Sequence, residues 1–258
     1  MYEVRNSQFI KIFDELCYCH DRLTVFSDFV KMCAISIYNS FANSETLEKE
    51  YLRTINSYNK KEQELFTKLF AELIMMYEQS NEIVDILGPI YMNTKSKDKK
   101  LGQVFTPEHI AELMAELNVA NDENLKTKIE KDGFITVMDP ACGSGGLVLA
   151  YAKALKKHNI NYQSDLLIDV TDISDTCVYM VYIQLSLYGI PAIVKCGNTL
   201  TQEIRFTLVT PLYFLQYWKF IKKSKDNTTN QTENIIEKTI QNNLKEVMVK
   251  GNCQISLF

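Results

Sequence analysis

A glycine-rich turn is the part of the chain whose residues could most directly hold a ligand. The segment VMDPACGSGGLVLAYAKAL, residues 137–155, reads as a buried strand, a turn from Asp139 to Gly146, and a helix. Glycines let a ligand approach the backbone, because no Cβ atom stands in its way. The turn lacks the Gly-Lys-Ser/Thr of a phosphate-binding loop and the wider glycine spacing of a dinucleotide fingerprint. Asp139 favours a ligand with cationic groups instead, and the alternative is a tight strand–helix turn that binds nothing.

Two further segments should lie beside this turn. Asp172 ends the next apolar segment, DLLIDVTD, and ligands of open α/β sheets bind outside the carboxyl ends of the strands. A carboxylate at that point can accept hydrogen bonds from both hydroxyls of a ribose. Upstream, Thr106 followed by Pro107 predicts a helix start, with Thr106 as the N-cap and Pro107 at the first helical position. The free amides of such a helix end suit an anionic group.

These three segments carry a resemblance to a known family. DPACGSGG resembles the first motif of S-adenosylmethionine-dependent DNA adenine-N6 methyltransferases, especially the modification subunits of type I restriction systems. LGQVFTPEHIAELM resembles the motif that helps to hold the methionine end of the cofactor in that family. VTDISDTCVYMVYIQLSLYGI resembles its second motif, in which an acidic residue binds the ribose. The resemblance covers about residues 85 to 200 and implies S-adenosylmethionine as cofactor and DNA as substrate.

The resemblance also implies which residues contact the cofactor. Asp139 would face the ammonium side and Asp172 the ribose, while Asn198 stands where the family usually has an aspartate near the adenine. The full set of implied cofactor-binding residues is Phe105, Thr106, Pro107, Asp139, Pro140, Ala141, Gly143, Gly145, Asp172, Ile173 and Asn198.

The substrate half of the family's site is degenerate in this sequence. The family places an Asn/Asp-Pro-Pro-Tyr/Phe motif after the fourth strand to receive the flipped adenine, and this chain contains no Pro-Pro. The nearest match, with Thr210, Pro211 and Tyr213 as catalytic residues, lacks the carboxamide that binds the adenine amine. Two hypotheses stay open. One is a minimal methyltransferase, weak or inactive alone, that needs a specificity or catalytic partner subunit; the other is a catalytically inactive scaffold or regulator of a DNA-processing complex.

The elements that would position these residues fall into two regions. No glycine or proline precedes Gly88, so residues 1–92 are predicted to form an all-helical N-terminal domain. Residues 93–100 form a basic linker, whose alternative is a mobile loop that contacts nucleic-acid phosphates. Residues 101–225 alternate apolar strands with helices, which predicts an α/β fold with a truncated, Rossmann-like, mostly parallel sheet of four or five strands. Residues 226–258 are a polar tail with one helix.

Composition bounds the cellular setting. With 28 basic and 32 acidic residues, the net charge of −4 gives no general attraction to nucleic acid. The seven cysteines lack the paired spacings of a disulfide or zinc framework, which predicts reduced thiols, no metal and a cytoplasmic location. Cys17 and His20 are interpreted as buried helix residues. Neither a signal peptide nor a membrane span is expected.

The last five residues form a separate motif, QISLF. Gln254, Leu257 and Phe258 resemble the peptide by which bacterial DNA polymerases and repair proteins bind the replication sliding clamp. In that mode, the Leu-Phe pair fills an apolar pocket while the glutamine amide binds at the rim. The alternative is that the apolar pair folds back onto the protein's own core.

Overall fold

The N-terminal region is helical. The computed structural model describes residues 8–95, 105–122, 124–217 and 219–220. Its first helices are α1 (Gln8–Leu16), α2 (Arg22–Ala42), α3 (Glu45–Ile55), α4 (Lys60–Glu78) and α5 (Leu87–Lys95). The side chains of Asp21, Ser44 and Asn59 each accept the backbone N–H three residues later, and so fix the starts of α2, α3 and α4.

Helix α5 runs past the predicted end of the helical region. It continues to Lys95, and the buried Thr94 donates its hydroxyl to the carbonyl of Ile90 at 2.8 Å. Residues 93–95 therefore belong to this helix rather than to a linker, because burial and this backbone bond favour one more helical turn. Residues 96–100 of the predicted linker lie outside the described residues.

The segment between α1 and α2 corrects another interpretation. Cys17 and His20 were expected inside a helix, but α1 ends at Leu16, so both lie in the connecting turn. Cys19 is exposed, and Nε2 of His20 lies 3.0 Å from Oε1 of Glu62 on α4. Across the described part of the chain, no group of three or more His, Cys, Asp or Glu side chains is placed to hold a metal ion.

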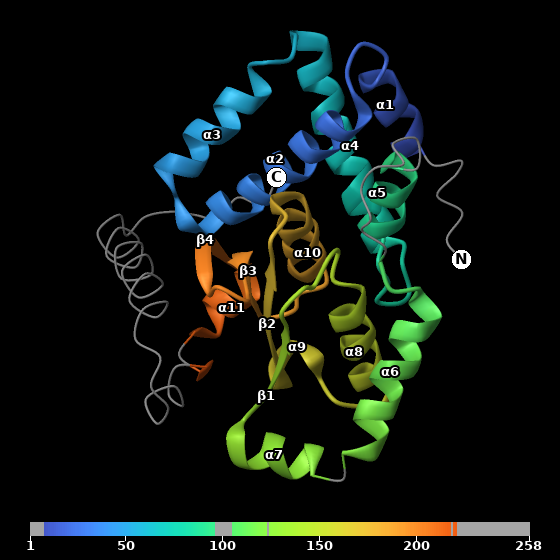
Figure 1. The fold of residues 1–258 in the computed structure, drawn as a ribbon, viewed down its shortest axis with the longest axis vertical. Helices are drawn as coiled ribbons and strands as arrows, with labels where there is room; N and C mark the ends of the chain where they lie inside the picture. Colours follow the sequence, from blue (N-terminus) through green and yellow to red (C-terminus); the bar gives the residue numbers. More distant parts are fainter. Residues whose placement is uncertain (1–7, 96–104, 123, 218, 221–258) are drawn as a thin grey trace.

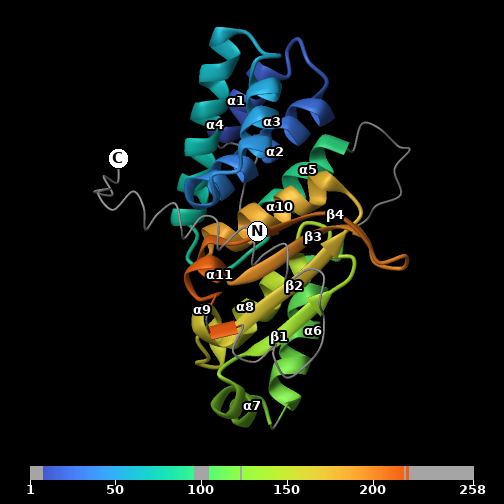
Figure 2. The same ribbon diagram turned by 90° about the vertical axis from the view of Figure 1, so that its left-hand side faces the viewer.

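A sheet of four strands lies below the helical region in Figure 2. Its strands are β1 (Ile135–Asp139), β2 (Leu166–Asp172), β3 (Ala192–Asn198) and β4 (Glu203–Val209), in the order β1-β2-β3-β4. The first three are parallel, and β4 runs antiparallel to β3. The remaining helices are α6 (Glu108–Asn121), α7 (Leu125–Asp132), α8 (Gly146–Lys157), α9 (Tyr162–Asp165), α10 (Asp175–Leu187) and α11 (Pro211–Leu215) (Figure 1). The structure thus confirms an α/β fold, in which a helical N-terminal region precedes a mostly parallel sheet.

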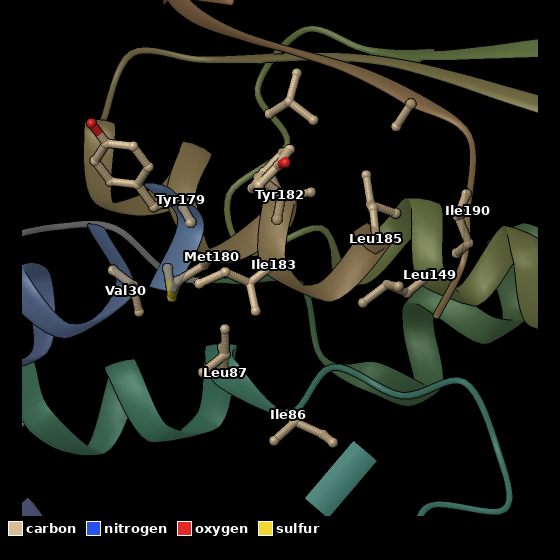
Figure 3. Packing of buried hydrophobic residues seen from close by; sticks show 14 of the residues in the cluster. Val30, Ile86, Leu87, Leu149, Tyr179, Met180, Tyr182, Ile183, Leu185 and Ile190 are labelled. Carbon is tan, nitrogen blue, oxygen red and sulfur yellow. The ribbon is translucent and has the colours of Figure 1, made fainter. Parts of the chain in front are cut away.

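Helix α10 joins the helical region and the sheet into one hydrophobic core. All of its residues from 177 to 185 are buried, because it packs on β2 and β3 on one side and on α2 and α5 on the other. In the close view of Figure 3, Met180 and Ile183 lie on the side of Val30 and Leu87. The N-terminal helices therefore support the helix that covers the sheet.

Several predictions fall on residues that the structure does not describe. The polar tail, its helix and the QISLF motif with Gln254, Leu257 and Phe258 all lie beyond residue 220, outside the described residues. Among the helices that are described, none has the length and apolar character needed to cross a membrane.

Candidate cofactor site at the carboxyl edge of the sheet

The glycine turn after β1 has a backbone that only glycine adopts easily. Gly143 and Gly145 have φ angles of 55° and 96°, both in the left-handed region. A Cβ atom at Gly143 would lie 2.9 Å from Cε1 of Phe105, and one at Gly145 would lie 2.6 Å from Cγ2 of Val181. Glycine is therefore required at both positions for two reasons, the left-handed backbone angle and the close approach of a neighbouring side chain.

Asp172 links this turn to the end of β2 by a hydrogen bond. Its Oδ2 accepts the backbone N–H of Gly143 at 2.9 Å, and its Oδ1 accepts that of Ser174 at 2.8 Å. The side chain is 6% exposed, so the two backbone donors stabilise a carboxylate that is largely out of water. Each oxygen has a second lone pair, and the carboxylate keeps acceptor capacity for a ligand.

The hairpin between β3 and β4 is tied to the other end of the turn. Oδ1 of Asn198 accepts the backbone N–H of Leu200 at 2.9 Å, which shapes the hairpin. Thr199 donates its hydroxyl to the carbonyl of Pro140 at 2.7 Å. Two apolar side chains stand exposed around this point, Ile173 at 62% and Leu200 at 95%. The hairpin projects past the sheet in Figure 2 and borders the same edge.

Asp139 has a local role in the turn. Its Oδ1 accepts the backbone N–H of Ala141 at 3.0 Å, while Pro140 and Ala141 are exposed. The carboxylate thus helps to shape the first half of the turn, on the side that the β3–β4 hairpin contacts.

The segment before α6 lies against the turn, but its helix starts one residue later than expected. Phe105 packs beside Gly143 and stacks on Tyr91 with ring centroids 5.9 Å apart. The N-cap is Pro107, not Thr106, because Pro107 has an extended ψ of 139° and its carbonyl accepts the N–H of Ile110 and Ala111. No side chain caps this end, and Thr106 is exposed. The first two amides of α6, those of Glu108 and His109, therefore keep their free donors.

A buried polar network behind the turn was not anticipated from the sequence. Gln184 of α10 is fully buried, and its Oε1 accepts the hydroxyl of Tyr77 at 2.8 Å and the N–H of Ile86 at 2.9 Å. Its Nε2 donates to Oδ1 of Asp85 at 2.9 Å and to the carbonyl of Ser144 at 2.7 Å. The hydroxyl of Ser144 donates to Oδ2 of Asp85 at 2.5 Å. The one signal in the sequence was a glutamine within an otherwise apolar helical segment.

A small cavity lies next to this network. Its volume is about 170 Å³, and it opens between the segment before α5, the start of α6 and the start of α8. On one side, Lys153 pairs with Glu82 at 2.5 Å and with Glu112 at 2.6 Å. Residues that line the cavity near the turn are Asp85, Gly88, Phe105, Thr106, Pro107 and Gly146.

Two further groups near this edge are Arg205, which forms an ion pair, and the thiol of Cys142, which is buried. Arg205 pairs with Asp175 at 2.6 Å and donates to the carbonyl of Ile173. Burial raises the pKa of the Cys142 thiol far above its ordinary value, with smaller contributions from nearby carboxylates. This thiol stays protonated at neutral pH, which excludes it as a thiolate nucleophile there.

The structure separates the predicted catalytic segment from this edge. Because β4 runs antiparallel to β3, its end lies beside the beginning of β3, at the amino edge of the parallel strands. Thr210 is fully buried there, where its hydroxyl donates to the carbonyl of Ile190 and accepts the N–H of Ala192. Pro211 begins α11, and Tyr213 is buried. The length of β3 puts this segment about 20 Å from the glycine turn, so Thr210, Pro211 and Tyr213 do not line a pocket with it.

The predicted cofactor residues, in contrast, are brought together. Phe105 contacts Gly143, Gly143 is bonded to Asp172, and Pro140 is bonded to the hairpin that begins at Asn198. Residues 83–246, more than half of the chain, match the family model described as N-6 DNA Methylase.

Proposed function

Because the chain belongs to the N-6 DNA methylase family, we propose that it binds S-adenosylmethionine at the glycine turn and acts as the cofactor-binding part of a DNA adenine-N6 methyltransferase. The family is typically dependent on this cofactor. The observation that carries the proposal is the turn at Gly143, held by Asp172 on one side and packed against Phe105 on the other. Such an edge of a parallel sheet is where ligands of open α/β folds bind.

The two ends of the cofactor have different surroundings in this proposal. The ribose lies at Asp172, which keeps acceptor capacity, and the adenine lies over the exposed apolar side chains of Ile173 and Leu200 beside Asn198. The amino-acid end lies toward Thr106 and Pro107, where the uncapped start of α6 favours a carboxylate.

The substrate half of the site is supplied by a partner, and the isolated chain is weak or inactive. In the described residues, the segment that resembles the catalytic motif lies at the opposite edge of the sheet, around Thr210. Doubly wound sheets usually place a fourth strand beside the first, at the point where ligands bind. Here β1 is an edge strand of the described sheet, and Met138 on it is 71% exposed. A modification subunit of a type I restriction system, with a specificity or catalytic partner, fits this arrangement.

Calorimetry followed by a transfer assay tests the proposal. We expect the full chain to bind S-adenosylmethionine and S-adenosylhomocysteine, and to transfer little tritiated methyl to mixed duplex DNA by itself. If neither ligand binds at millimolar concentration, the proposal fails. Robust methylation by the chain alone would contradict its dependence on a partner.

A second candidate is a scaffold or regulator that keeps the cofactor fold without catalysis. It is favoured by the same position of Thr210, which leaves the described carboxyl edge without the family's acceptor for the adenine amine. Cofactor binding without methyl transfer, also in the presence of a specificity subunit encoded nearby, would support this second function.

A further inference from the structure

We infer that Asp85 is the residue that binds the ammonium group at the amino-acid end of the cofactor. This inference rests on the proposed function and adds to it a residue that lies outside the glycine turn. It replaces Asp139, the ammonium partner that the sequence resemblance implies, by a carboxylate on the opposite side of the turn.

Asp85 has no cationic partner among the described residues. Its three donors are the N–H of Gly88 at 2.7 Å, Nε2 of Gln184 at 2.9 Å and the hydroxyl of Ser144 at 2.5 Å, all of them uncharged. No Lys, Arg or His among the described residues forms an ion pair with it, whereas the nearby Lys153 is occupied by Glu82 and Glu112. A carboxylate offers about four acceptor positions, so about one is left.

Asp85 is also one of the residues that line the cavity beside the turn. Asp85 lines this cavity of about 170 Å³ together with Gly88 and Gly146. A Cβ atom at Gly88 would collide with Oδ2 of Asp85 and lie 2.6 Å from the hydroxyl of Ser144. A Cβ atom at Gly146 would lie 3.6 Å from the same Oδ2. The absence of both side chains leaves the carboxylate close to the backbone of the turn that the cofactor contacts.

The start of α6, which also lines the cavity, has the complementary charge. Pro107 caps α6 without a side-chain hydrogen bond, so the first amides of the helix present free donors and a partial positive charge. An amino-acid group carries an ammonium and a carboxylate on one carbon atom. Asp85 and the start of α6, both in the lining of the cavity, match these two charges, and Gln184 holds Asp85 in place from the buried side.

Asp139 is less well placed for this role. Its Oδ1 accepts the N–H of Ala141 in the first half of the turn, and the carbonyl of the following residue, Pro140, accepts the hydroxyl of Thr199 on the β3–β4 hairpin. Asp139 therefore lies on the side of the turn where the proposal puts the nucleoside. Glu108 also lines the cavity, but it is exposed to water, which weakens any ion pair that it forms.

The test compares two ligands that differ only in the amino-acid group. Calorimetry on the full chain measures the binding of S-adenosylhomocysteine and of 5′-methylthioadenosine, which keeps the nucleoside and the sulfur but has no ammonium. Asp85→Asn should weaken S-adenosylhomocysteine binding by about ten- to a hundredfold, the scale of one charge-assisted hydrogen bond, and leave methylthioadenosine binding unchanged. Glu108→Gln and Asp139→Asn are matched controls, for which we expect no such difference between the two ligands.

Asp85→Asn should fold, because an asparagine oxygen still accepts from Gly88 and Gln184 while its amide can donate to Ser144. A second measurement uses the wild-type chain, and so does not depend on whether Asp85→Asn folds. The decarboxylated analogue of S-adenosylhomocysteine keeps the ammonium alone, and it should bind about tenfold or more tightly than methylthioadenosine.

Three results would overturn the inference. Equal weakening of both ligands by Asp85→Asn would show a purely structural role, and a selective loss in Asp139→Asn would return the ammonium to the residue implied by the sequence. Equal binding of methylthioadenosine and the decarboxylated analogue by the wild-type chain would remove the ammonium site altogether. The failure of all these nucleosides to bind would instead contradict the proposed function, and this inference with it.

Discussion

Replacing Gln184 by leucine should sharply lower the free energy of unfolding, although the two side chains are similar in size. The change removes the amide oxygen and the amide nitrogen of Gln184, which together join the helical region to the glycine turn. It leaves the hydroxyl of Tyr77, the N–H of Ile86 and the carbonyl of Ser144 buried without these hydrogen bonds. Each such group costs about 1–3 kcal/mol, so the loss from the three groups should be on the order of 3–9 kcal/mol. That is a large part of the roughly 5–15 kcal/mol that stabilises a typical domain.

Urea denaturation followed by circular dichroism measures this loss, with two comparison variants. Tyr77→Phe should lose only about 1 kcal/mol, because Oε1 of Gln184 keeps the N–H of Ile86 and that of Leu87 as donors. Gln79→Leu changes an exposed glutamine at the end of α4, and should stay within about 0.5 kcal/mol of wild type. The reasoning is refuted if Gln184→Leu keeps the wild-type midpoint, or if Gln79→Leu loses as much.

Gln184→Glu adds a dependence on pH to the same test. The new carboxyl would face Oδ1 of Asp85 and the carbonyl of Ser144, where the amide now donates. Burial and the neighbouring carboxylate would raise its pKa above the ordinary value of about 4.3. An acidic group whose pKa is raised on folding is best tolerated in its protonated form. The stability of this variant should therefore come closest to that of wild type below about pH 4.3, and should fall as the pH rises through the raised pKa.

Three other outcomes are expected. Gly143→Ala should lower the free energy of unfolding by about 1–3 kcal/mol, since alanine resists the left-handed backbone angle and its Cβ would crowd Phe105; an unchanged thermal midpoint would contradict this. Asp172→Ala should weaken the binding of S-adenosylhomocysteine by about 1–3 kcal/mol in calorimetry, because the turn loses its fastening and the ribose its acceptor; wild-type affinity would argue against that site. A bacterial sliding clamp should retain the wild-type chain in a pull-down but not the double variant Leu257→Ala, Phe258→Ala, and equal retention of both would remove the clamp hypothesis.

The sequence determined the parts of this protein that depend on local pattern. The strand around residues 135–139, the glycine turn and the following helix could be predicted because apolar runs, glycines and the start of a periodic helix are neighbours in the chain. The position of Asp172 at the end of β2 followed in the same way, and its side chain proved to touch Gly143 because parallel strands end at one edge of the sheet. The N-cap of a helix is harder to predict. The sequence placed it at Thr106, but the extended ψ angle of Pro107 makes Pro107 the N-cap of α6.

Only the tertiary structure decided which edge of the sheet each later segment reaches. The sequence suggested that Thr210 follows a strand ending at the cofactor, yet β4 turns back along β3 and carries it to the other edge. The connection between the two strands, residues 199–202, is too short for the crossover of a dozen or more residues that a parallel strand requires. The direction of a strand is set by such pairing and not by its own composition. For the same reason, the role of Gln184 became visible only when packing brought Asp85 and Ser144, distant in sequence, within hydrogen-bonding distance of its amide nitrogen.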